Sequence, residues 1–285
     1  PKGTAHAGKV TKPANTGRLV NALENAMGTE LEKGMSGWYV MDPLYDAYKA
    51  LGLSDEEAAR RFKDFQVFTG VHSSASDVKT ELTRGTGALY LNEQGRMDDY
   101  VKYGGKVGQP GAPDDMSRFP GHFAHKTAHG VPLRNYLENG ALTMKSPKVP
   151  LYIQSAGVPE TGFQTEMPVG DAHFSRAIGL ADVRPDKDKG GATDESWTTP
   201  EAQQLTPWWR EQVASQVDLE SVPAQALAWG LFSPQTGVDT PVGVPKLEIL
   251  AQMIAERARE RGIPIEQARD EILMGQDYVS SLAPK

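Results

Sequence analysis

Two charged residues in the middle of the chain have side chains and sequence settings that suit general-base and nucleophilic catalysis. Lys148 lies in a short turn before an apolar segment, and Asp171 lies directly before a segment with helical character. The dipole at a helix N-terminus favours an ionised aspartate, which can act as a general base or stabilise a developing cation. A lysine whose amine is desolvated can attack an electrophilic carbon. Lys148 and Asp171 are therefore the best candidates for a catalytic pair.

Each of these residues also has a structural interpretation. In this interpretation, Asp171 does no more than cap a helix over residues 173–178. Lys145, Lys148 and Arg176 can instead form a phosphate-binding patch, which is a common role for surface cations. The sequence leaves both alternatives open.

Three histidines, His122, His125 and His129, recur at the spacing that places them on one face of a helix. Such a face can bind a metal ion. Lys126 and Arg134 lie nearby, so the same face can also contact DNA phosphates. No carboxylate accompanies the histidines in this segment, and we expect no metal site. Whether this face binds metal, DNA or nothing stays open.

The tryptophans permit two interpretations as well. Aromatic side chains that can stack on nucleobases are Trp38 beside Tyr39, Trp208 beside Trp209, and Trp229. Large aromatic side chains are more often used to fill a core, and we favour that use here.

The elements that position these residues are predicted to be helices. Residues 1–17 lack an apolar period and are expected to form a flexible arm, whereas residues 18–285 form the helical domain. An apolar series ends at Gly52, after which Ser54 and Glu57 have the spacing of a capping box for a helix over residues 55–68. A helix over residues 73–91 is expected to be interrupted by its glycines, which would allow close packing against a neighbour.

The second half of the chain continues this pattern. Gly and Pro are frequent in residues 102–120, and residues 182–200 are strongly polar, so both segments are predicted to be loops. Further helices are predicted over residues 123–137, 207–217, 223–232 and 245–261. Alternating period-2 runs are scarce, which favours an all-α fold with two lobes that share a cleft.

The composition restricts the class of protein. The chain has 285 residues, of which 39% are hydrophobic and 24% charged, as is usual for a globular protein. It contains no cysteine, which excludes disulfides and thiolate metal sites, and it has no apolar stretch typical of a membrane span or a signal peptide. A formal net charge of −7 argues against broad, nonspecific coating of nucleic acid. We expect a cytoplasmic protein, in the host cytoplasm if it is viral, with no membrane partner.

Residues 148–149 and 169–173, with the pattern V-x-D-x-H-x-x-R, resemble the helix-hairpin-helix DNA glycosylase superfamily. The resemblance covers roughly residues 60–180, which would form a six-helix lobe with the hairpin, while the N-terminal and C-terminal helices would form the second lobe. It implies that Lys148 is the lysine and Asp171 the aspartate of the active site. The hairpin glycines of that superfamily are replaced here by Lys145-Ser146-Pro147, and Pro147 lacks a backbone donor.

A later P-x-Q-A-x-x-W pattern, which ends in Trp229, is similar to a bacteriophage branch of this superfamily. This branch comprises alpha-glutamyl/putrescinyl thymine pyrophosphorylases, also called amino acid:DNA transferases. The resemblance implies transfer of an amino acid amine onto phosphorylated 5-hydroxymethyluracil in DNA, with base flipping; the alternative is a DNA glycosylase, with or without lyase activity. The expected partners are DNA and a free amino acid or amine, with no cofactor and a monomeric state. The expected contacts to DNA or substrate are Lys145, Ser146, His173, Arg176, His125 and Lys126.

Overall fold

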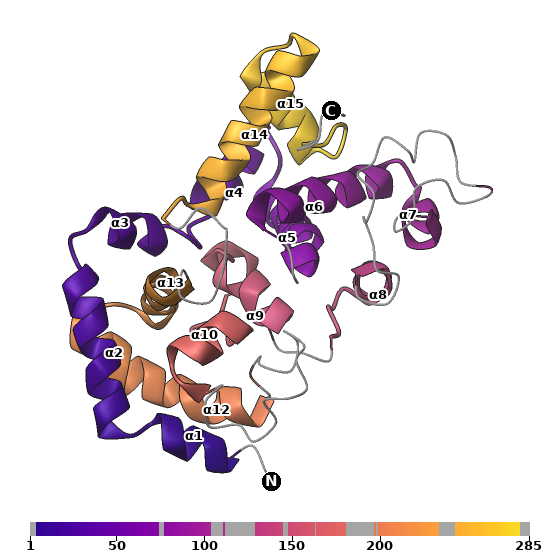
Figure 1. The fold of residues 1–285 in the computed structure, drawn as a ribbon. Helices are drawn as coiled ribbons and strands as arrows, with labels where there is room; N and C mark the ends of the chain where they lie inside the picture. Colours follow the sequence, from indigo (N-terminus) through magenta and orange to yellow (C-terminus); the bar gives the residue numbers. More distant parts are fainter. Residues whose placement is uncertain are drawn as a thin grey trace. The chain divides into compact units, whose positions relative to one another are not determined.

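The computed structural model describes residues 4–73, 77–103, 111, 129–144, 148–162, 164–180, 197, 199–233 and 243–279. Within these ranges the chain forms helices and no strand, which confirms the predicted all-α class (Figure 1). None of the helices in the same ranges is long and apolar enough to cross a membrane. The chain divides into two compact units, which are described separately below.

Unit 1 comprises residues 1–40, 145–157 and 164–246. Its central helix is α13 (Ser221–Phe232), which packs against α2 (Pro13–Ala26), α3 (Glu30–Ser36) and α10 (Ala172–Ala177) (Figure 1). The α13 segment is apolar around most of its circumference, as expected of a helix that is surrounded by others. Gly230 allows α3 to approach closely, since a Cβ atom there would lie 2.7 Å from the Met35 Cγ.

The N-terminal segment corrects the expectation of a flexible arm. Residues 4–10 form α1 (Thr4–Val10), and Ala7 and Val10 are buried, with α12 (Thr199–Trp208) packed against this helix. Pro13 then occupies the first turn of α2, where its missing N–H has no consequence. The apolar residues of α1 are too few to produce a visible period. Burial by a helix distant in sequence therefore determines the structure of this segment.

The predicted helix over residues 207–217 is divided in the structure. Helix α12 ends at Trp208, a π turn spans Trp209–Val213, and a 3-10 turn follows to Val217. Trp209 is fully buried, and its indole Nε1 donates to the Ser221 carbonyl at 2.9 Å. Core packing is thus the role of this tryptophan, as favoured from the sequence.

Unit 2 comprises residues 41–144, 158–163 and 247–285, so that the C-terminal helices belong with the segment that follows α3. These unit boundaries differ from the two lobes predicted from the sequence, since residues 145–157 and 164–180 lie in unit 1. The helices of unit 2 are α4 (Asp42–Ala50), α5 (Asp55–Gly70), α6 (Val78–Glu93), α7 (Met97–Tyr103), α8 (Val131–Asn139), α14 (Lys246–Arg261), whose first residue belongs to unit 1, and α15 (Ile265–Leu273). Helix α9 (Lys148–Ser155) belongs to unit 1. Two 3-10 turns lie at Val71–Ser73 and Pro159–Thr161.

Helices α5 and α6 form the centre of unit 2. The prediction that Gly85 interrupts its helix was wrong, because α6 is continuous from Val78 to Glu93. The predicted close packing is confirmed: a Cβ atom on Gly85 would lie 2.4 Å from the Thr69 Cα of α5. Ser54 caps α5, as its hydroxyl accepts a hydrogen bond from the Glu57 amide at 3.2 Å. The predicted start of this helix is therefore confirmed.

Candidate functional site

Asp171 forms the N-cap of α10. Its backbone is extended, and its carboxylate Oδ1 accepts a hydrogen bond from the Phe174 amide at 2.8 Å. The side chain is half-buried. Among the described residues, the second oxygen, Oδ2, has no hydrogen-bond partner, so the capping role uses only part of the carboxylate. The capping interpretation is therefore confirmed, and among the described residues the cap bond engages Oδ1 alone.

Gly170, the residue before Asp171, is held in place by Trp197. The Trp197 amide donates to the Gly170 carbonyl at 2.8 Å, and a Cβ atom on Gly170 would lie 2.1 Å from the Trp197 Cγ. Only a glycine allows this approach of ring and backbone. Phe174, one turn into α10, packs its ring against Trp197 at 5.4 Å and against Trp209 at 4.8 Å between centroids. The start of α10 is thus held by buried aromatic contacts.

The C-terminal end of α10 is held by polar contacts from α2. The Arg18 guanidinium donates to the Ala177 carbonyl at 2.6 Å, and the Asn15 amide donates to the Ile178 carbonyl at 2.9 Å. These bonds satisfy carbonyl groups that a helix end leaves without partners. Because both ends of α10 are fixed, Asp171 has a defined position in unit 1.

A group of five aromatic side chains, here called the aromatic cluster, lies next to α10. Its members are Trp38, Tyr39, Tyr152, His173 and Trp229. The Trp229 ring lies 5.6 Å from the Trp38 ring and 6.2 Å from the His173 ring, and the Tyr39 and Tyr152 rings meet edge to face at 5.9 Å. Trp38 is buried, whereas the other four are half-buried. Part of the aromatic surface of the cluster is therefore accessible, while Trp38 belongs to the core.

Two polar side chains accompany the aromatic cluster. Gln225 is buried one turn before Trp229 on α13, and its Oε1 accepts a hydrogen bond from the Tyr39 hydroxyl at 3.3 Å. Lys246, the first residue of α14, is 2% exposed, and its Nζ lies 5.1 Å from the centroid of the Tyr152 ring. Aromatic faces can stack on a planar base, while an amide and an ammonium can bond to its edge.

The structure places several predicted site residues near this cluster. Lys148 is the first residue of α9 and lies one turn before Tyr152, so the two share a face of that helix. His173 belongs to the cluster itself, and Arg176 lies one turn further along α10. No hydrogen bond or ion pair among the described residues joins Lys148 to Asp171. The predicted contacts Lys145, Ser146, His125 and Lys126 lie outside the described residues.

The histidine face predicted in the first half of the chain is not exposed at the one position described. His129 is 3% exposed, and its ring lies 4.7 Å from that of His72, while His122 and His125 lie outside the described residues. The His72 Nδ1 donates to the Phe68 carbonyl at 2.7 Å, and its Nε2 lies 2.5 Å from the Tyr100 hydroxyl. In the part of the chain that the structure describes, no three His, Asp or Glu side chains are grouped to hold a metal. His129 is thus part of the core of unit 2.

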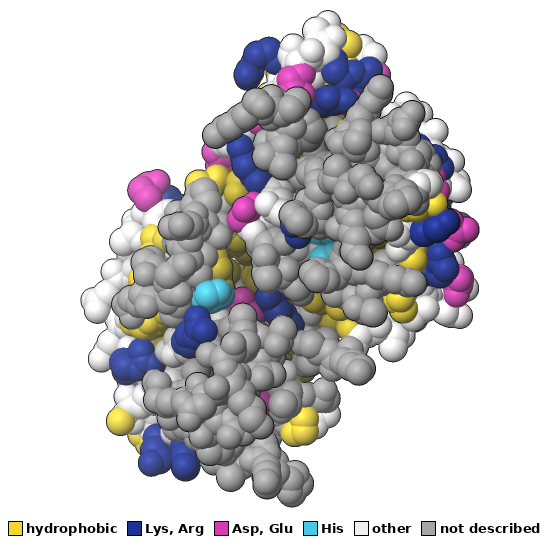
Figure 2. Space-filling model, turned by 45° about the vertical axis from the view of Figure 1, so that its right-hand side comes forward, with side chains coloured by type: hydrophobic (Ala, Val, Ile, Leu, Met, Phe, Trp, Pro, Cys, Tyr) yellow, Lys and Arg dark blue, Asp and Glu magenta, His cyan; other side chains and the backbone are white. Residues whose placement is uncertain are grey.

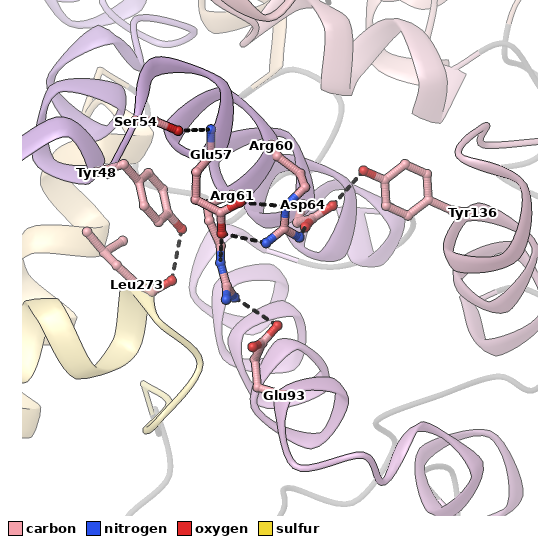
Figure 3. A network of polar contacts seen from close by, with 9 residues as sticks. All are labelled: Tyr48, Ser54, Glu57, Arg60, Arg61, Asp64, Glu93, Tyr136 and Leu273. Atoms are coloured by element: carbon pink, nitrogen blue, oxygen red, sulfur yellow. Dashed lines mark hydrogen bonds and ion pairs between the residues drawn. The ribbon is translucent and has the colours of Figure 1, made fainter. Parts of the chain in front are cut away.

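Unit 2 contains a network of charged residues on α5 and its neighbours (Figure 3). Glu57 pairs with Arg60 at 2.6 Å and with Arg61 at 3.1 Å, and Arg61 also pairs with Glu93 at 2.9 Å. Asp64 accepts a hydrogen bond from the Tyr136 hydroxyl at 2.7 Å and pairs with Arg60 at 3.0 Å. Burial raises the pKa of Asp64 despite these partners.

A second set of ion pairs joins α14 to the segment after α15. Asp277 pairs with Arg257 at 2.7 Å and with Arg261 at 2.9 Å. Burial alone would raise the pKa of Asp277, but hydrogen bonds from Arg257 and the Tyr278 backbone, together with Arg261, lower it. Figure 2 shows basic and acidic side chains beside one another where α14 turns into α15. Opposite charges are therefore paired within this unit.

Sequence reasoning missed three residues of the site, namely Tyr152, Lys246 and the role of Gln225 as a partner of Tyr39. The spacing of Gln225 and Trp229 places both on one face of α13, which is a signal that the sequence does contain. Lys246 gives no such signal, because a lysine after a proline reads as an exposed helix start.

Comparison with known proteins identifies no relative: no family model, curated protein or solved structure matches this chain.

Proposed function

We propose that this protein is an enzyme that modifies a base in DNA, with a two-lobed architecture of the glycosylase type. The proposed reaction transfers an amino acid amine onto phosphorylated 5-hydroxymethyluracil. The observation that carries the proposal is the aromatic cluster, in which half-buried Tyr152 shares helix α9 with Lys148 and half-buried His173 lies on α10, the helix that Asp171 caps. An enzyme that acts on a base must extrude it from the stack and bind it between aromatic or apolar side chains.

The chemistry assigns roles to three of the predicted residues. The amine nitrogen attacks the methylene carbon of the base, the bond from that carbon to the phosphate oxygen breaks, and the phosphate leaves with its electron pair. The Oδ2 atom of Asp171, which the cap bond leaves free, accepts the proton that the amine loses. Lys148 and Arg176 supply positive charge for the departing phosphate.

Nucleoside mass spectrometry of digested product DNA tests this proposal. Wild-type protein, phosphorylated 5-hydroxymethyluracil DNA and a panel of amino acids and simple amines should give an amine adduct. Asp171→Asn should abolish adduct formation without unfolding the protein, because asparagine is also a good N-cap. The matched control is Asp77→Asn, since Asp77 caps α6 through the same kind of bond, from the Thr80 amide at 2.7 Å. This control should retain wild-type activity.

The same assay distinguishes the competing functions. Free base, abasic sites or a borohydride-trapped complex through Lys148 would instead identify a DNA glycosylase, with or without lyase activity. If no amine gives an adduct, the transferase proposal fails. If the wild type, Asp171→Ala and Lys148→Ala all bind DNA equally well and none of them changes the base, the protein is a binding module.

A further inference from the structure

Trp197 is the one aromatic residue of the polar segment 182–200, and it is nevertheless buried, with 2% of its surface exposed. Its backbone amide donates to the Gly170 carbonyl at 2.8 Å, and its ring leaves no room for a Cβ atom on Gly170. Among the described residues its indole Nε1 has no hydrogen-bond partner, although a buried indole N–H usually has one. Packing and the backbone hydrogen bond therefore fix the position of this ring.

The contacts of Trp197 lie on both sides of Asp171. Gly170 directly precedes Asp171 in the chain and is held by the backbone and the ring of Trp197. Phe174, three residues after Asp171, packs its ring against Trp197 with 5.4 Å between centroids. The Phe174 amide is also the donor of the cap bond to the Asp171 Oδ1, at 2.8 Å. Trp197 therefore contacts both the residue that leads into Asp171 and the residue to which the carboxylate is bonded.

Helix α10 depends on such contacts because it is short. It has six residues, whereas isolated helices of fewer than about 12 residues are marginal in water. Tertiary packing must therefore stabilise its first turn, which carries the cap. Trp197 supplies a backbone hydrogen bond and a ring contact to this turn from a part of the chain that lies more than twenty residues further on.

We propose that Trp197 is a positioning residue that holds the Asp171 carboxylate in its working orientation. The inference rests on the proposed function, in which Asp171 accepts the proton of the attacking amine. A general base must be kept within hydrogen-bond reach of the proton that it removes. Trp197 lies beyond residues 60–180, the segment covered by the resemblance, and its polar surroundings in the sequence gave no signal of this role.

Steady-state kinetics of adduct formation tests the inference through Trp197→Leu, which keeps an apolar side chain but removes the ring. The kcat should fall by about tenfold to about a hundredfold, as expected when a reacting group is misplaced, while the KM for DNA stays within about twofold. Trp208→Leu is the matched control. Trp208 is a buried tryptophan of the same unit and bonds to Thr16 at 3.0 Å, so the kcat of its folded variant should stay near wild type.

Amide hydrogen exchange examines the cap bond of Asp171 without any substrate. Trp197→Leu should speed exchange of the Phe174 amide relative to the Glu32 amide by about fivefold, as for loss of one N-cap bond. Glu32 is the reference because its amide donates to the Thr29 hydroxyl, at 3.3 Å, in the same unit. A general loss of stability would speed both amides alike. In an Asp171→Ala background, where the cap bond is already absent, Trp197→Leu should leave this ratio unchanged.

Two further variants support these measurements. Gly170→Ala forces the same contact apart from the opposite side, and it should change the kcat and the exchange ratio in the same direction as Trp197→Leu. Trp197→Phe retains a ring and should show smaller changes in that direction. If circular dichroism shows that Trp197→Leu does not fold, Trp197→Phe replaces it in both experiments.

A wild-type kcat or an unchanged exchange ratio in Trp197→Leu would overturn the inference. Equal losses of kcat in Trp197→Leu and Trp208→Leu, or a loss that appears as a raised KM, would overturn it too. Failure of the proposed function looks different, since wild-type protein would then form no amine adduct while the exchange ratio still responds to Trp197→Leu. Conversely, adduct formation by wild type together with an unchanged ratio would refute only the role of Trp197.

Discussion

The aromatic cluster of unit 1 and the charged network of unit 2 use polar side chains in opposite ways. In the network, Glu57, Asp64 and Glu93 each pair with an arginine, and Tyr136 donates to Asp64, so the charges satisfy one another (Figure 3). In the cluster, the charged and amide groups lie among rings, and four of the five rings are half-buried.

This difference indicates where binding and where stability reside. A carboxylate whose acceptor sites are filled by arginine and tyrosine has little capacity left for a ligand, and its removal affects folding. Half-buried rings beside a partly used carboxylate can still take a stacked base and a proton. We therefore expect substitutions in unit 2 to change the free energy of unfolding, and those in the cluster to change DNA binding and chemistry.

The largest expected effect is a loss of stability caused by a substitution in unit 2. Arg257→Met removes the partner that bonds Asp277 with two nitrogens, at 2.8 and 2.7 Å, and leaves a buried carboxylate with Arg261 and the Tyr278 backbone. The free energy of unfolding should fall by about 3 kcal/mol, the lower end for breaking a buried pair. Chemical denaturation followed by circular dichroism measures this loss.

Arg259→Met is the control for this substitution, since Arg259 is exposed on the same helix and should change stability by less than about 0.5 kcal/mol. Adduct formation or DNA binding by folded Arg257→Met should remain at the wild-type level. A specific loss of DNA binding without loss of stability would break the proposed division between the two regions.

The next largest expected effect is a loss of DNA binding caused by a substitution in the aromatic cluster. Trp229→Leu removes the ring that lies between Trp38 and His173, and it should weaken binding of single-stranded DNA that contains the target base by about 1–3 kcal/mol, as for loss of one stacking ring. Trp208→Leu is the matched control: Trp208 is buried and bonds to Thr16 at 3.0 Å, so its loss should lower stability and not affinity. If both variants bind DNA like wild type, the cluster is only core.

The local rules of helix formation were sufficient to predict much of this fold. The cap at Ser54 and the stop at Gly52, where φ is +79°, depend on residues adjacent in sequence and are confirmed. The same holds for Asp171 as an N-cap, and α14 ends at Arg261 as predicted, followed by Gly262 with a φ of +67°.

Features that depend on distant residues could not be predicted in this way. Helix α1 is short, and Ala7 and Val10 are buried only because α12 lies against them. Lys246 is buried, and the turn before it packs on Gly34, far away in the sequence. No local pattern distinguishes this lysine from an exposed one. The pairing of Tyr39 with Tyr152 joins residues more than a hundred positions apart, and its recognition required the folded chain.

The smallest expected effect concerns the pH dependence of stability at Asp64. Burial raises the pKa of this carboxyl, with the hydrogen bond from Tyr136 and the charges of Arg60 and Arg61 opposing that shift. A group whose pKa is higher in the folded state contributes stability at pH values below its unfolded pKa, and this contribution is lost as the pH rises through the folded pKa. Asp64→Asn keeps an acceptor for the Tyr136 hydroxyl but cannot ionise.

The stability of Asp64→Asn relative to wild type should therefore increase as the pH is raised from about 3 to about 7. Denaturation curves at a series of pH values measure this difference, and exposed Asp46→Asn serves as the control. A relative stability that instead falls toward neutral pH would show that ionised Asp64 is favoured by its partners. The network would then resemble the Asp277 site, where arginine pairing outweighs burial.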